Sequence, residues 1–540
     1  MNKLFTRLVE KRQLPADFLY PNYAKLTDPY ILPDMQQAIK RIKSAIDRQE
    51  KVLIYGDYDV DGVTASTLME DALRLAGIKN LEIMLPDRFL DGYGMSPRLI
   101  THAKDHGVNL VITVDCGSRN HDIIKELGIL GIDTVVTDHH ECDTELPPAV
   151  AVINPKRKDY FGTTSFRDLA GVGVAFKLAE ALVKSGLIPA GQEKWLLDLV
   201  LLGTICDNMP LTGENRTLGF FGIKVLEKTR RLGLKELMKN AGVKNITSES
   251  IGFQIGPRLN AAGRIDAAKL ALDLLRTRSA AEAASLASKL EELNKERRAK
   301  QRAATDEIIE RGIDESPVII ATGNWHEGIL GIVAGRLVEK YHKPTFVLTE
   351  VENGILKGSG RSFGDFNLAE ALSYAGDAII SGGGHAGAAG VRVYQKDLYA
   401  FREKINAYYE SLHLTNQENY LKTHFDLPID NLQDFTFDLI EDLRLLEPYG
   451  AGNEEPVFRL SGARILEAKR MGDKGQHLRL NLNDGQGKIL KCVAFFVPED
   501  WLALDVDAEC DFLIRPVMNE WNGVRSVEAR LVDIVKPDML

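Results

Sequence analysis

Short apolar segments alternate with amphipathic segments from residue 51 to about residue 155. The apolar segments are rich in Val, Ile and Leu, which predicts buried β-strands. They are Val52–Tyr55, Leu81–Leu85, Leu110–Val114, Thr134–Val136 and Val150–Ile153. The amphipathic segments, which predict helices, are Thr64–Ala76, Pro97–His106 and Asn120–Leu127. Strands that alternate with helices predict an α/β domain with a mostly parallel, doubly wound sheet.

Other patterns predict further units around this sheet. A polar arm with a lead-in helix at Asp34–Gln49 precedes it, and helices at Gly173–Ser185 and Lys194–Ile205 follow it. The long helical pattern Ala280–Arg311 predicts a rigid connector, and its basic run is typical of a solvated face. A second α/β unit begins near Pro317, and the short strands near the end of the chain predict an OB-like β-barrel. We expect an arm (1–50), a catalytic domain (51–278), a connector helix (279–312), a second α/β domain (313–410), and a linker with the barrel (411–540).

Composition supports several domains and excludes a membrane protein. At 540 residues the chain is too long for one core, and its hydrophobic (44%) and charged (27%) fractions are those of a globular protein. No apolar run reaches the length of a membrane span, and the first residues do not have the pattern of a signal peptide. The five cysteines form no C-x-x-C pair, which predicts reduced thiols and a cytoplasmic location. The net charge of −10 disfavours general nucleic-acid binding but leaves room for a local basic groove.

Three carboxylates follow the first predicted strand. Asp57, Asp59 and Asp61 stand at alternate positions, where they repel one another unless a cation lies between them. Hard divalent cations bind carboxylate oxygens, so the pattern predicts a metal site. A solvated acidic turn is the plain alternative. An EF-hand loop is disfavoured, because Leu68 stands where its closing Glu is needed.

Two further strands end in acidic residues. Asp115 ends one, and Asp138 ends the next and leads into His139 and His140. Each Asp alone is typical of a turn or helix cap. Because the carboxyl ends of parallel strands lie along one edge, we expect all these side chains to face one crevice. Carboxylates with imidazole suit Mn²⁺ or Mg²⁺, and this many acids predicts two ions, the arrangement used for phosphoester hydrolysis.

Later segments offer an additional acid and several candidate phosphate contacts. Asp207 ends an apolar helix, where it is either a ligand or a simple helix stop. In the small-residue segment Gly256–Asp266, read as a loop, Arg258, Asn260 and Arg264 would bind phosphate or form a salt bridge at a helix cap.

The second α/β unit is rich in glycine. Ser359 and Arg361 lie in one glycine-containing segment, and His385 lies in Ser381–Gly390. Glycine lets backbone N–H groups approach an anion, so the pair of segments predicts a phosphate or substrate clamp, with tight β-turn packing as the alternative. The aromatic residues of the barrel would stack on bases or fill its core: Phe458, Phe495, Phe496, Trp501 and Trp521.

Together these motifs resemble a known superfamily. The stretches Gly56–Gly62, Val114–Gly117, Asp138–His140 and Asp207 are similar to the four motifs of the DHH phosphoesterases, although Val60 stands where the family most often has Ala. The Ser381–Gly390 block resembles the DHH-associated domain. Three more stretches resemble the RecJ family within that superfamily: Gly256–Asp266, Gly323–Gly335 and Leu446–Pro456.

This resemblance implies an activity and a set of roles. It implies a 5′→3′ exonuclease that is specific for single-stranded DNA, releases mononucleotides, depends on Mn²⁺ or Mg²⁺, and serves DNA repair and recombination. The implied metal ligands are Asp57, Asp59, Asp61, Asp115, His139 and Asp207. The implied catalytic residues are His140, Asp138 and Asp57. The implied DNA contacts are Arg88, Arg258, Asn260, Arg264, Ser359, Arg361 and His385.

Single-stranded DNA is the implied partner, and a single-strand-binding protein and a helicase are further candidates. We expect a monomer with no membrane association, and no additional C-terminal partner-binding domain. One rival is a DHH hydrolase of short oligoribonucleotides, cyclic dinucleotides or pyrophosphate, which would need no long groove. Another is a binding protein on a degenerate scaffold, disfavoured because every acidic and His position of the motifs is present.

Overall fold

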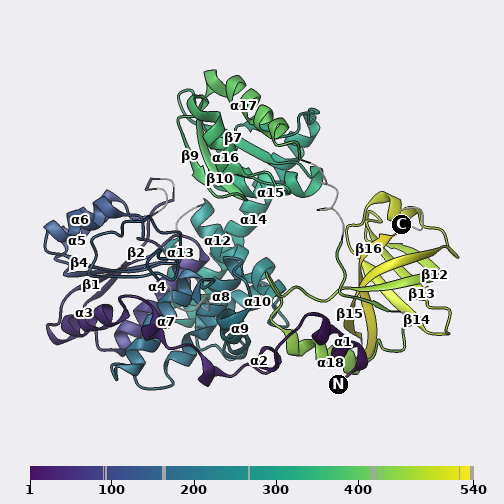
Figure 1. The fold of residues 1–540 in the computed structure, drawn as a ribbon, viewed down its shortest axis with the longest axis horizontal. Helices are drawn as coiled ribbons and strands as arrows, with labels where there is room; N and C mark the ends of the chain where they lie inside the picture. The colour runs from purple at the N-terminus through teal and green to yellow at the C-terminus, as the bar shows by residue number, and fades with distance from the viewer. Residues whose placement is uncertain are drawn as a thin grey trace.

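The fold is taken from a computed structural model of the chain. It describes residues 1–535 except 89, 92–93, 161–165, 266–267, 415–419, 421–422, 430 and 522, and it leaves the side chains of residues 500 and 521 undescribed. Figure 1 shows an α/β body at the left, a smaller α/β unit at the top and a β-barrel at the right. The predicted architecture of two α/β units, a long connector helix and an OB-like barrel is confirmed.

The large body is built on a parallel sheet with the strand order β2-β1-β3-β4-β5. Its strands are β1 (Val52–Tyr55), β2 (Leu81–Met84), β3 (Leu110–Val114), β4 (Asp133–Thr137) and β5 (Ala151–Ile153). The helices between them are α4 (Val60–Leu75), α5 (Pro97–Asp105) and α6 (His121–Ile129). The chain moves outward from β1 to β2 and then returns to β3, so the direction of winding reverses between β1 and β3. In open α/β sheets, ligands bind at the carboxyl ends of the strands beside such a reversal.

The strands bury both faces of this sheet. In β1, Val52 and Ile54 pack on one side with α4, α7 (Gly171–Lys184) and α8 (Leu197–Cys206). Leu53 and Tyr55 pack on the other side with α5 and α6. Successive side chains of a strand point to opposite faces of the sheet. Because both faces are buried here, every position is apolar and the strands form continuous apolar runs.

Several helices cover the first face and continue toward the centre of the molecule. They are α9 (Gly213–Leu226), α10 (Leu232–Asn240), α11 (Ser248–Ser250), the π-helical turn η5 (Ile251–Ile255), α12 (Gly256–Ile265) and α13 (Lys269–Arg276). The prediction of a loop at residues 256–266 is wrong, because α12 occupies its described part. A side chain at Gly263 would lie 2.8 Å from the Tyr58 carbonyl oxygen, so the small residues there allow close helix packing.

The connector helix α14 (Ala280–Glu310) leads to a second sheet with the order β6-β7-β8-β10-β9. Its strands are β6 (Ile319–Gly323), β7 (Thr345–Glu352), β8 (Ile355–Arg361), β9 (Ser381–Gly384) and β10 (Ala388–Tyr394), and its helices are α15 (Leu330–Tyr341), α16 (Leu368–Ala375) and α17 (Leu398–Ser411). The two glycine-rich segments are therefore largely paired strands rather than loops. Their glycines fit close packing, since a side chain at Gly360 would lie 2.7 Å from the Phe346 ring.

Five strands form the C-terminal barrel in the described part of the chain. They are β12 (Phe458–Met471), β13 (His477–Asn483), β14 (Ile489–Ala494), β15 (Glu509–Trp521) and β16 (Val524–Val535). The β12–β15 pairing closes the barrel, and β11 (Leu427–Ile429) extends it beside β12. Among the predicted stacking residues, Phe458 is buried in the core, Trp501 is half-buried, and Phe495 and Phe496 are exposed. The side chain of Trp521 lies outside the described residues.

The N-terminal arm contacts both the barrel side of the molecule and the large α/β body. Helix α1 (Lys3–Lys11) packs against the barrel side beside α18 (Phe437–Leu443), and Figure 1 shows the N-terminus there. Leu4, Phe5 and Leu8 belong to the barrel core. The short helix α2 (Ala16–Leu19) follows, and α3 (Met35–Asp47) then packs against the large sheet, as the predicted lead-in helix requires.

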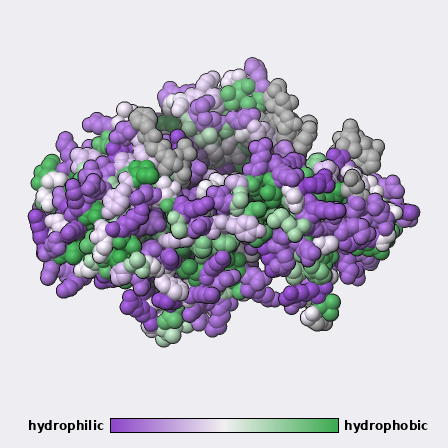
Figure 2. All heavy atoms as spheres, turned by 60° about the horizontal axis from the view of Figure 1, so that its bottom comes forward, coloured by the Kyte–Doolittle hydropathy of each residue, from purple (hydrophilic) through white to green (hydrophobic). Residues whose placement is uncertain are grey.

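Hydropathy varies over the face of the molecule that Figure 2 draws. On the face drawn in Figure 2, hydrophilic residues predominate and hydrophobic residues are scattered in small groups. None of the helices in the described part of the chain has the length and apolar character needed to cross a bilayer.

Candidate metal centre and adjoining groove

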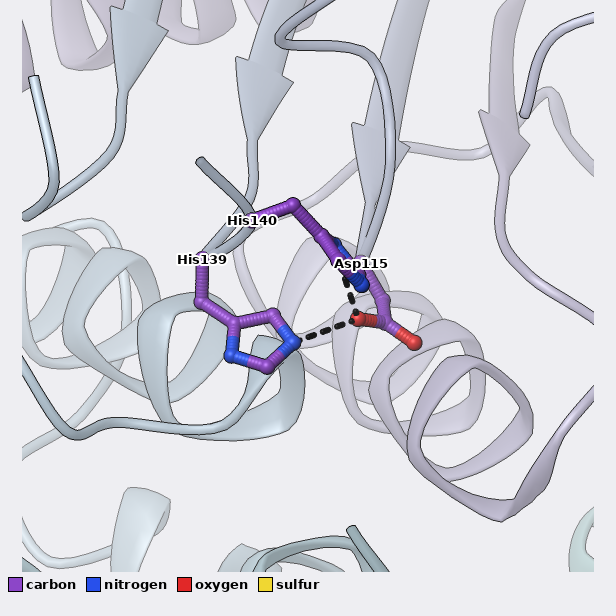
Figure 3. Close-up of side chains that lie close together, drawn as sticks. All are labelled: Asp115, His139 and His140. Atoms are coloured by element: carbon purple, nitrogen blue, oxygen red, sulfur yellow. Dashed lines mark ion pairs between the residues drawn. The ribbon is translucent and has the colours of Figure 1, made fainter. Parts of the chain in front are cut away.

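Acidic and histidine side chains converge where β1, β3 and β4 end. The segment after β1 supplies Asp57, Asp59 and Asp61, the segment after β3 supplies Asp115, and the segment after β4 supplies the Asp138–His140 motif. Asp207, at the C-terminal end of α8, completes the cluster. In Figure 3 the rings of His139 and His140 both point toward one carboxylate oxygen of Asp115.

Two of the three acids after β1 are fixed by the starts of helices. Asp59 is the N-cap of α4 and accepts a hydrogen bond from the Gly62 N–H at 3.0 Å. Helix α4 therefore begins at Val60, four residues before the predicted start. Asp61 accepts hydrogen bonds from the Gly171 N–H (2.6 Å) and the Val172 N–H (2.9 Å) at the start of α7. A negative charge is favoured at that end of a helix, so α7 helps to hold a buried carboxylate.

Asp115 lies at the centre of the cluster in an unusual backbone conformation. Its φ of 61° falls in the left-handed region, which only a few per cent of non-glycine residues adopt. Its carboxylate lies against Gly171, where any side chain would come within 2.5 Å of it. Such conformations concentrate at functional sites, where the surrounding structure holds them in place.

The two neighbouring histidines have different surroundings. The His139 ring is buried, and its Nε2 atom lies 3.2 Å from Asp115, 3.6 Å from Asp207 and 3.8 Å from Asp61. The His140 ring is partly exposed, and its Nδ1 atom lies 2.8 Å from the Asp138 carboxylate. Asp138 also accepts hydrogen bonds from the backbone N–H groups of Ser118, His139 and His140. It therefore fixes the whole histidine loop.

Burial and mutual repulsion shift the protonation of the cluster. Burial, followed by the charge of Asp59, raises the pKa of Asp57 to about 8 and that of Asp207 to about 7. Burial and neighbouring acids raise the pKa values of Asp61 and Asp115 well above the ordinary range. These directions show that the site holds more negative charge than the protein itself neutralises.

The pKa values of the two histidines shift in opposite directions. Burial and the neighbouring His140 lower the pKa of His139 to about 3. Burial would also lower the pKa of His140, but its hydrogen bond to Asp138 raises it to about 9. Burial would raise the pKa of Asp138, but His140 holds it well below the usual range. At neutral pH His139 is therefore a neutral imidazole, and His140 is a cation paired with an anion.

The residues fit divalent metal ions. Three groups each hold ligand atoms that lie within 4.8 Å of one another: Asp115, His139 and His140; Asp61, His139 and Asp207; and Asp57, Asp59 and Asp115. Both ring nitrogens of His139 and one oxygen of Asp115 are buried without a hydrogen-bond partner in the described structure. Oxygen ligands with one or two imidazoles are the donor set that Mn²⁺ and Mg²⁺ accept.

A cavity of about 710 Å³ begins beside the metal centre. Cys206 and Asn208, which flank Asp207, line it. Its walls also include α12, the connector α14, α15, the segment Glu447–Ala451 and the barrel strands β15 and β16. The catalytic body, the connector and the barrel thus enclose one groove that leads to the metal centre. Four arginines from these elements line it: Arg264, Arg297, Arg515 and Arg530.

Three of the predicted DNA contacts form a cationic cluster between the two α/β units. Burial, followed by Arg88, Arg297 and Arg361, lowers the pKa of Arg264 to about 9. Burial and Arg88 also lower the pKa of Arg361. The Arg361 guanidinium donates to the Ser359 hydroxyl at 3.2 Å, and both lie against Gly331 near the start of α15. Like charges gathered in this way favour an anionic ligand.

The remaining predicted contacts are more dispersed. Arg258 forms an ion pair with Glu291 of α14 at 2.5 Å and donates to the Gln254 carbonyl oxygen. It therefore joins two helices by a salt bridge, whereas the alternative interpretation placed that salt bridge at a helix cap. Asn260 lines the cavity. His385 accepts a hydrogen bond from the Gly387 N–H at 3.2 Å in the turn between β9 and β10.

Several residues that line the groove were not predicted from the sequence. Arg297 belongs to the basic run that is typical of a solvated face, yet it lines the cavity, while Lys295, two residues before it, is exposed. Its basic run could have drawn attention to it, but helical periodicity alone does not show which face meets the groove. Arg515 and Arg530 come from barrel strands, and no local motif marks them.

Three parts of the chain match models of known protein families. Residues 51–204 match the N-terminal domain of the DHH family, residues 315–411 match the DHHA1 domain, and residues 425–533 match the RecJ OB domain. The fold and the site therefore define a protein of the DHH class.

Individual relatives narrow the assignment. The chain is 37% identical to the single-stranded-DNA-specific exonuclease RecJ of Bacillus subtilis, over 96% of this chain and 65% of that protein. It is 33% identical to the RecJ of Haemophilus influenzae, over 95% of this chain and 92% of that protein. The chain belongs to the RecJ family. It spans just under two thirds of the Bacillus relative's length.

A solved structure shares the architecture. The crystal structure of RecJ from Thermus thermophilus in complex with Mn²⁺ superposes with a TM-score of 0.85 at 29% identity, over 99% of this chain and 76% of that chain. A second structure of the Thermus protein, in complex with Mg²⁺, gives a TM-score of 0.79 at 28% identity, with 99% and 75% of the two chains covered.

Proposed function

We propose that this protein is a 5′→3′ exonuclease that degrades single-stranded DNA to mononucleotides with two divalent ions, Mn²⁺ or Mg²⁺. The activity would serve DNA repair and recombination. The observation that carries the proposal is the buried cluster of acids and histidine at the end of an arginine-lined groove. The named relatives act on single-stranded DNA, and the solved Thermus RecJ structures hold these ions. In this proposal residues 51–278 perform hydrolysis, while 313–410 and the barrel hold the strand.

Asp57, Asp59, Asp61, Asp115, His139 and Asp207 would hold the ions. When bound, two such ions activate a water and neutralise charge on the phosphate under attack. The protein prepares the ligands by its own contacts. Helix α7 orients Asp61, and burial keeps His139 unprotonated, as a ligand nitrogen must be.

His140 would stabilise the charge that develops on the phosphate. It is protonated at neutral pH, partly exposed, and held by Asp138 at 2.8 Å. A positioned cation that does not need to reorient is the arrangement that stabilises a transition state most strongly. Asp138 would act as a positioning residue, since its contacts are with the loop and not with solvent.

The polarity of cleavage would come from the cationic cluster of Arg88, Arg264, Ser359 and Arg361. Guanidinium groups bind phosphate with paired hydrogen bonds, so this cluster would hold the terminal 5′-phosphate. A strand anchored there presents its first internal phosphodiester to the metal centre. Cleavage would then proceed one nucleotide at a time from the 5′ end.

The test uses single-stranded DNA oligonucleotides labelled at either end, a matched blunt duplex and an RNA of the same sequence, all with Mn²⁺. We expect the 5′ label to appear at once as mononucleotide, the 3′-labelled strand to shorten progressively, and the duplex to resist. Release of the 3′ label first would overturn the polarity. Survival of the DNA with hydrolysis of dinucleotides or short RNA would favour the smaller-substrate DHH activity instead.

We propose further that the protein acts as a monomer in the cytoplasm, where a helicase and a single-strand-binding protein supply its substrate. Cys116, Cys142, Cys206 and Cys492 form no disulfide bond, which supports a reducing compartment. Light scattering of the purified protein and co-purification from cell extract would test the oligomeric state and these partners.

A further inference from the structure

One large apolar side chain in the groove has no packing role. Phe253 is 79% exposed to solvent, and it lines the cavity of about 710 Å³ that begins beside Asp207. Its neighbours in η5, Ile251 and Ile255, are fully buried and anchor the turn to the catalytic body. The ring is therefore displayed on a fixed support.

The backbone around Phe253 is specialised. Residues Ile251–Ile255 form a π-helical turn that runs directly into α12. Such turns are rare and occur frequently at functional sites. Gly252 precedes Phe253, and a side chain at Gly252 would meet no atom within 4 Å, apart from its chain neighbours and the backbone of its own helix.

The same cavity presents two arginines without an acidic partner. No carboxylate of the described residues lies within ion-pair distance of Arg264 or Arg297. The buried Nε atom of Arg297 has no hydrogen-bond partner in this part of the structure. Arg515 and Arg530 differ, because they pair with Glu455 at 3.2 Å and Glu249 at 3.6 Å.

We propose that Phe253 is a base-stacking platform, on which a nucleobase of the bound strand rests while Arg264 and Arg297 contact its phosphates. This proposal rests on the proposed function. An aromatic face binds any base, so the contact would contribute affinity without sequence preference. It would also require an exposed base face, which a duplex does not offer.

A protein partner is a less suitable occupant of this position. An apolar protein surface would cover the Phe253 ring but would bury the guanidinium groups of Arg264 and Arg297 without an anionic partner, which is unfavourable. A single strand supplies what both groups lack, a flat apolar base and a negative phosphate.

The experiment compares Phe253→Ala, Phe253→Leu and Phe253→Trp in the full-length protein. Substrates are a single-stranded DNA and a set of strands in which one nucleotide near the 5′ end is abasic. We expect Phe253→Ala to raise KM for normal DNA roughly tenfold, within the range for one stacked base, with little change in kcat. Phe253→Trp should retain the native KM, and Phe253→Leu should fall between them.

The abasic strands supply the decisive comparison. For the native enzyme one abasic position should raise KM, and that penalty should disappear in Phe253→Ala, because the base and the ring act on each other. Tyr399→Ala on α17, whose side chain is 73% exposed, is the matched control and should behave as native.

Three outcomes separate the hypotheses. If Phe253→Ala keeps its full abasic penalty, or if Phe253→Leu matches the native KM, the stacking role is wrong while the exonuclease remains. If the native protein shows no cleavage of single-stranded DNA, the proposed function itself fails. An equal rise in KM in all three variants, including Phe253→Trp, would indicate a structural role and overturn the proposal.

Discussion

The metal centre and the arginine-lined groove are adjacent regions with opposite charge imbalances. In the metal centre, burial and neighbouring acids raise the pKa values of carboxylic acids, to about 8 for Asp57. In the groove, burial and neighbouring cations lower the pKa of Arg264 to about 9. Each region thus lacks the charge that its proposed ligand brings, divalent ions in the first and phosphates in the second. Both arrangements are unfavourable in the free protein, so they reflect binding and not stability.

The largest effect is expected from replacing Asp115, the central acid of the metal centre. Asp115→Asn should lower kcat by more than about 100-fold, since changes to metal-site residues commonly have effects of at least this size. Binding of single-stranded DNA should remain, because the groove is unchanged. Cleavage assays and fluorescence anisotropy on the same preparation measure the two effects.

The same variant should also separate function from stability. Without metal, Asp115→Asn should have a melting temperature equal to or above that of the native protein, because it removes one member of a repelling cluster. The rise in melting temperature on adding Mn²⁺ should disappear. Asp122→Ala, an exposed acid on α6, is the control. Native-like turnover in Asp115→Asn would contradict the assigned metal site.

Arg361→Gln removes one positive charge from the cationic cluster that lies between the two α/β units. We expect a loss of about 10- to 100-fold in kcat/KM on 5′-phosphorylated strands, the value of a charge-assisted phosphate contact. The loss should be much smaller on strands with a 5′-hydroxyl. Arg392→Gln, an exposed residue of β10, is the matched control. Equal losses on both substrates would remove the 5′-phosphate assignment.

The charge imbalance of the metal centre should appear as proton release. The raised pKa values of Asp57 (about 8) and Asp207 (about 7) mean that both acids are partly protonated in the metal-free protein at pH 7. Metal ligands must lose these protons, so Mn²⁺ affinity should rise as pH increases from 6 to 8. Calorimetric titration at pH 7 in two buffers with different ionisation enthalpies measures the release. Buffer-independent heats would show that these acids are already ionised.

The smallest effect distinguishes two arginines of α12. Arg258→Ala removes the ion pair with Glu291 and should lower the stability by about 1 kcal/mol, while KM changes little. Arg264→Ala removes a cation without an acidic partner, so it should raise KM and leave the stability nearly unchanged. Thermal unfolding and steady-state kinetics on both variants test the distinction. A larger rise in KM for Arg258→Ala than for Arg264→Ala would reverse it.

The local patterns of the sequence were sufficient for the sheet and the position of the cluster. The short apolar run Val52–Tyr55 predicted a buried strand, and acids at the ends of parallel strands predicted one crevice. The structure brings Asp59, Asp115 and His139 together at that edge. These predictions succeed because side-chain alternation and strand direction are properties of short segments.

Glycine content was misleading for a physical reason. It indicated a loop at residues 256–266, whose described part is a helix, whereas residues 381–390 form a strand pair and its turn, which fits the alternative of tight β-turn packing. Glycine serves there to let neighbouring backbones and rings approach, as at Gly263 and Gly360. The sequence cannot distinguish a flexible glycine from one required by a neighbour that lies far away in the chain.

Local sequence is enough to identify the chemical groups of this protein and the strand ends at which many of them lie. Which charges are left without a partner depends on the folded arrangement. Arg258 and Arg264 are six residues apart, yet only Arg258 meets a carboxylate in the described part of the chain, because α14 places Glu291 beside it. Phe253 likewise faces a groove that exists only once the barrel closes it. Composition and periodicity are local, whereas the pairing of a charge or the exposure of a ring depends on segments distant in sequence.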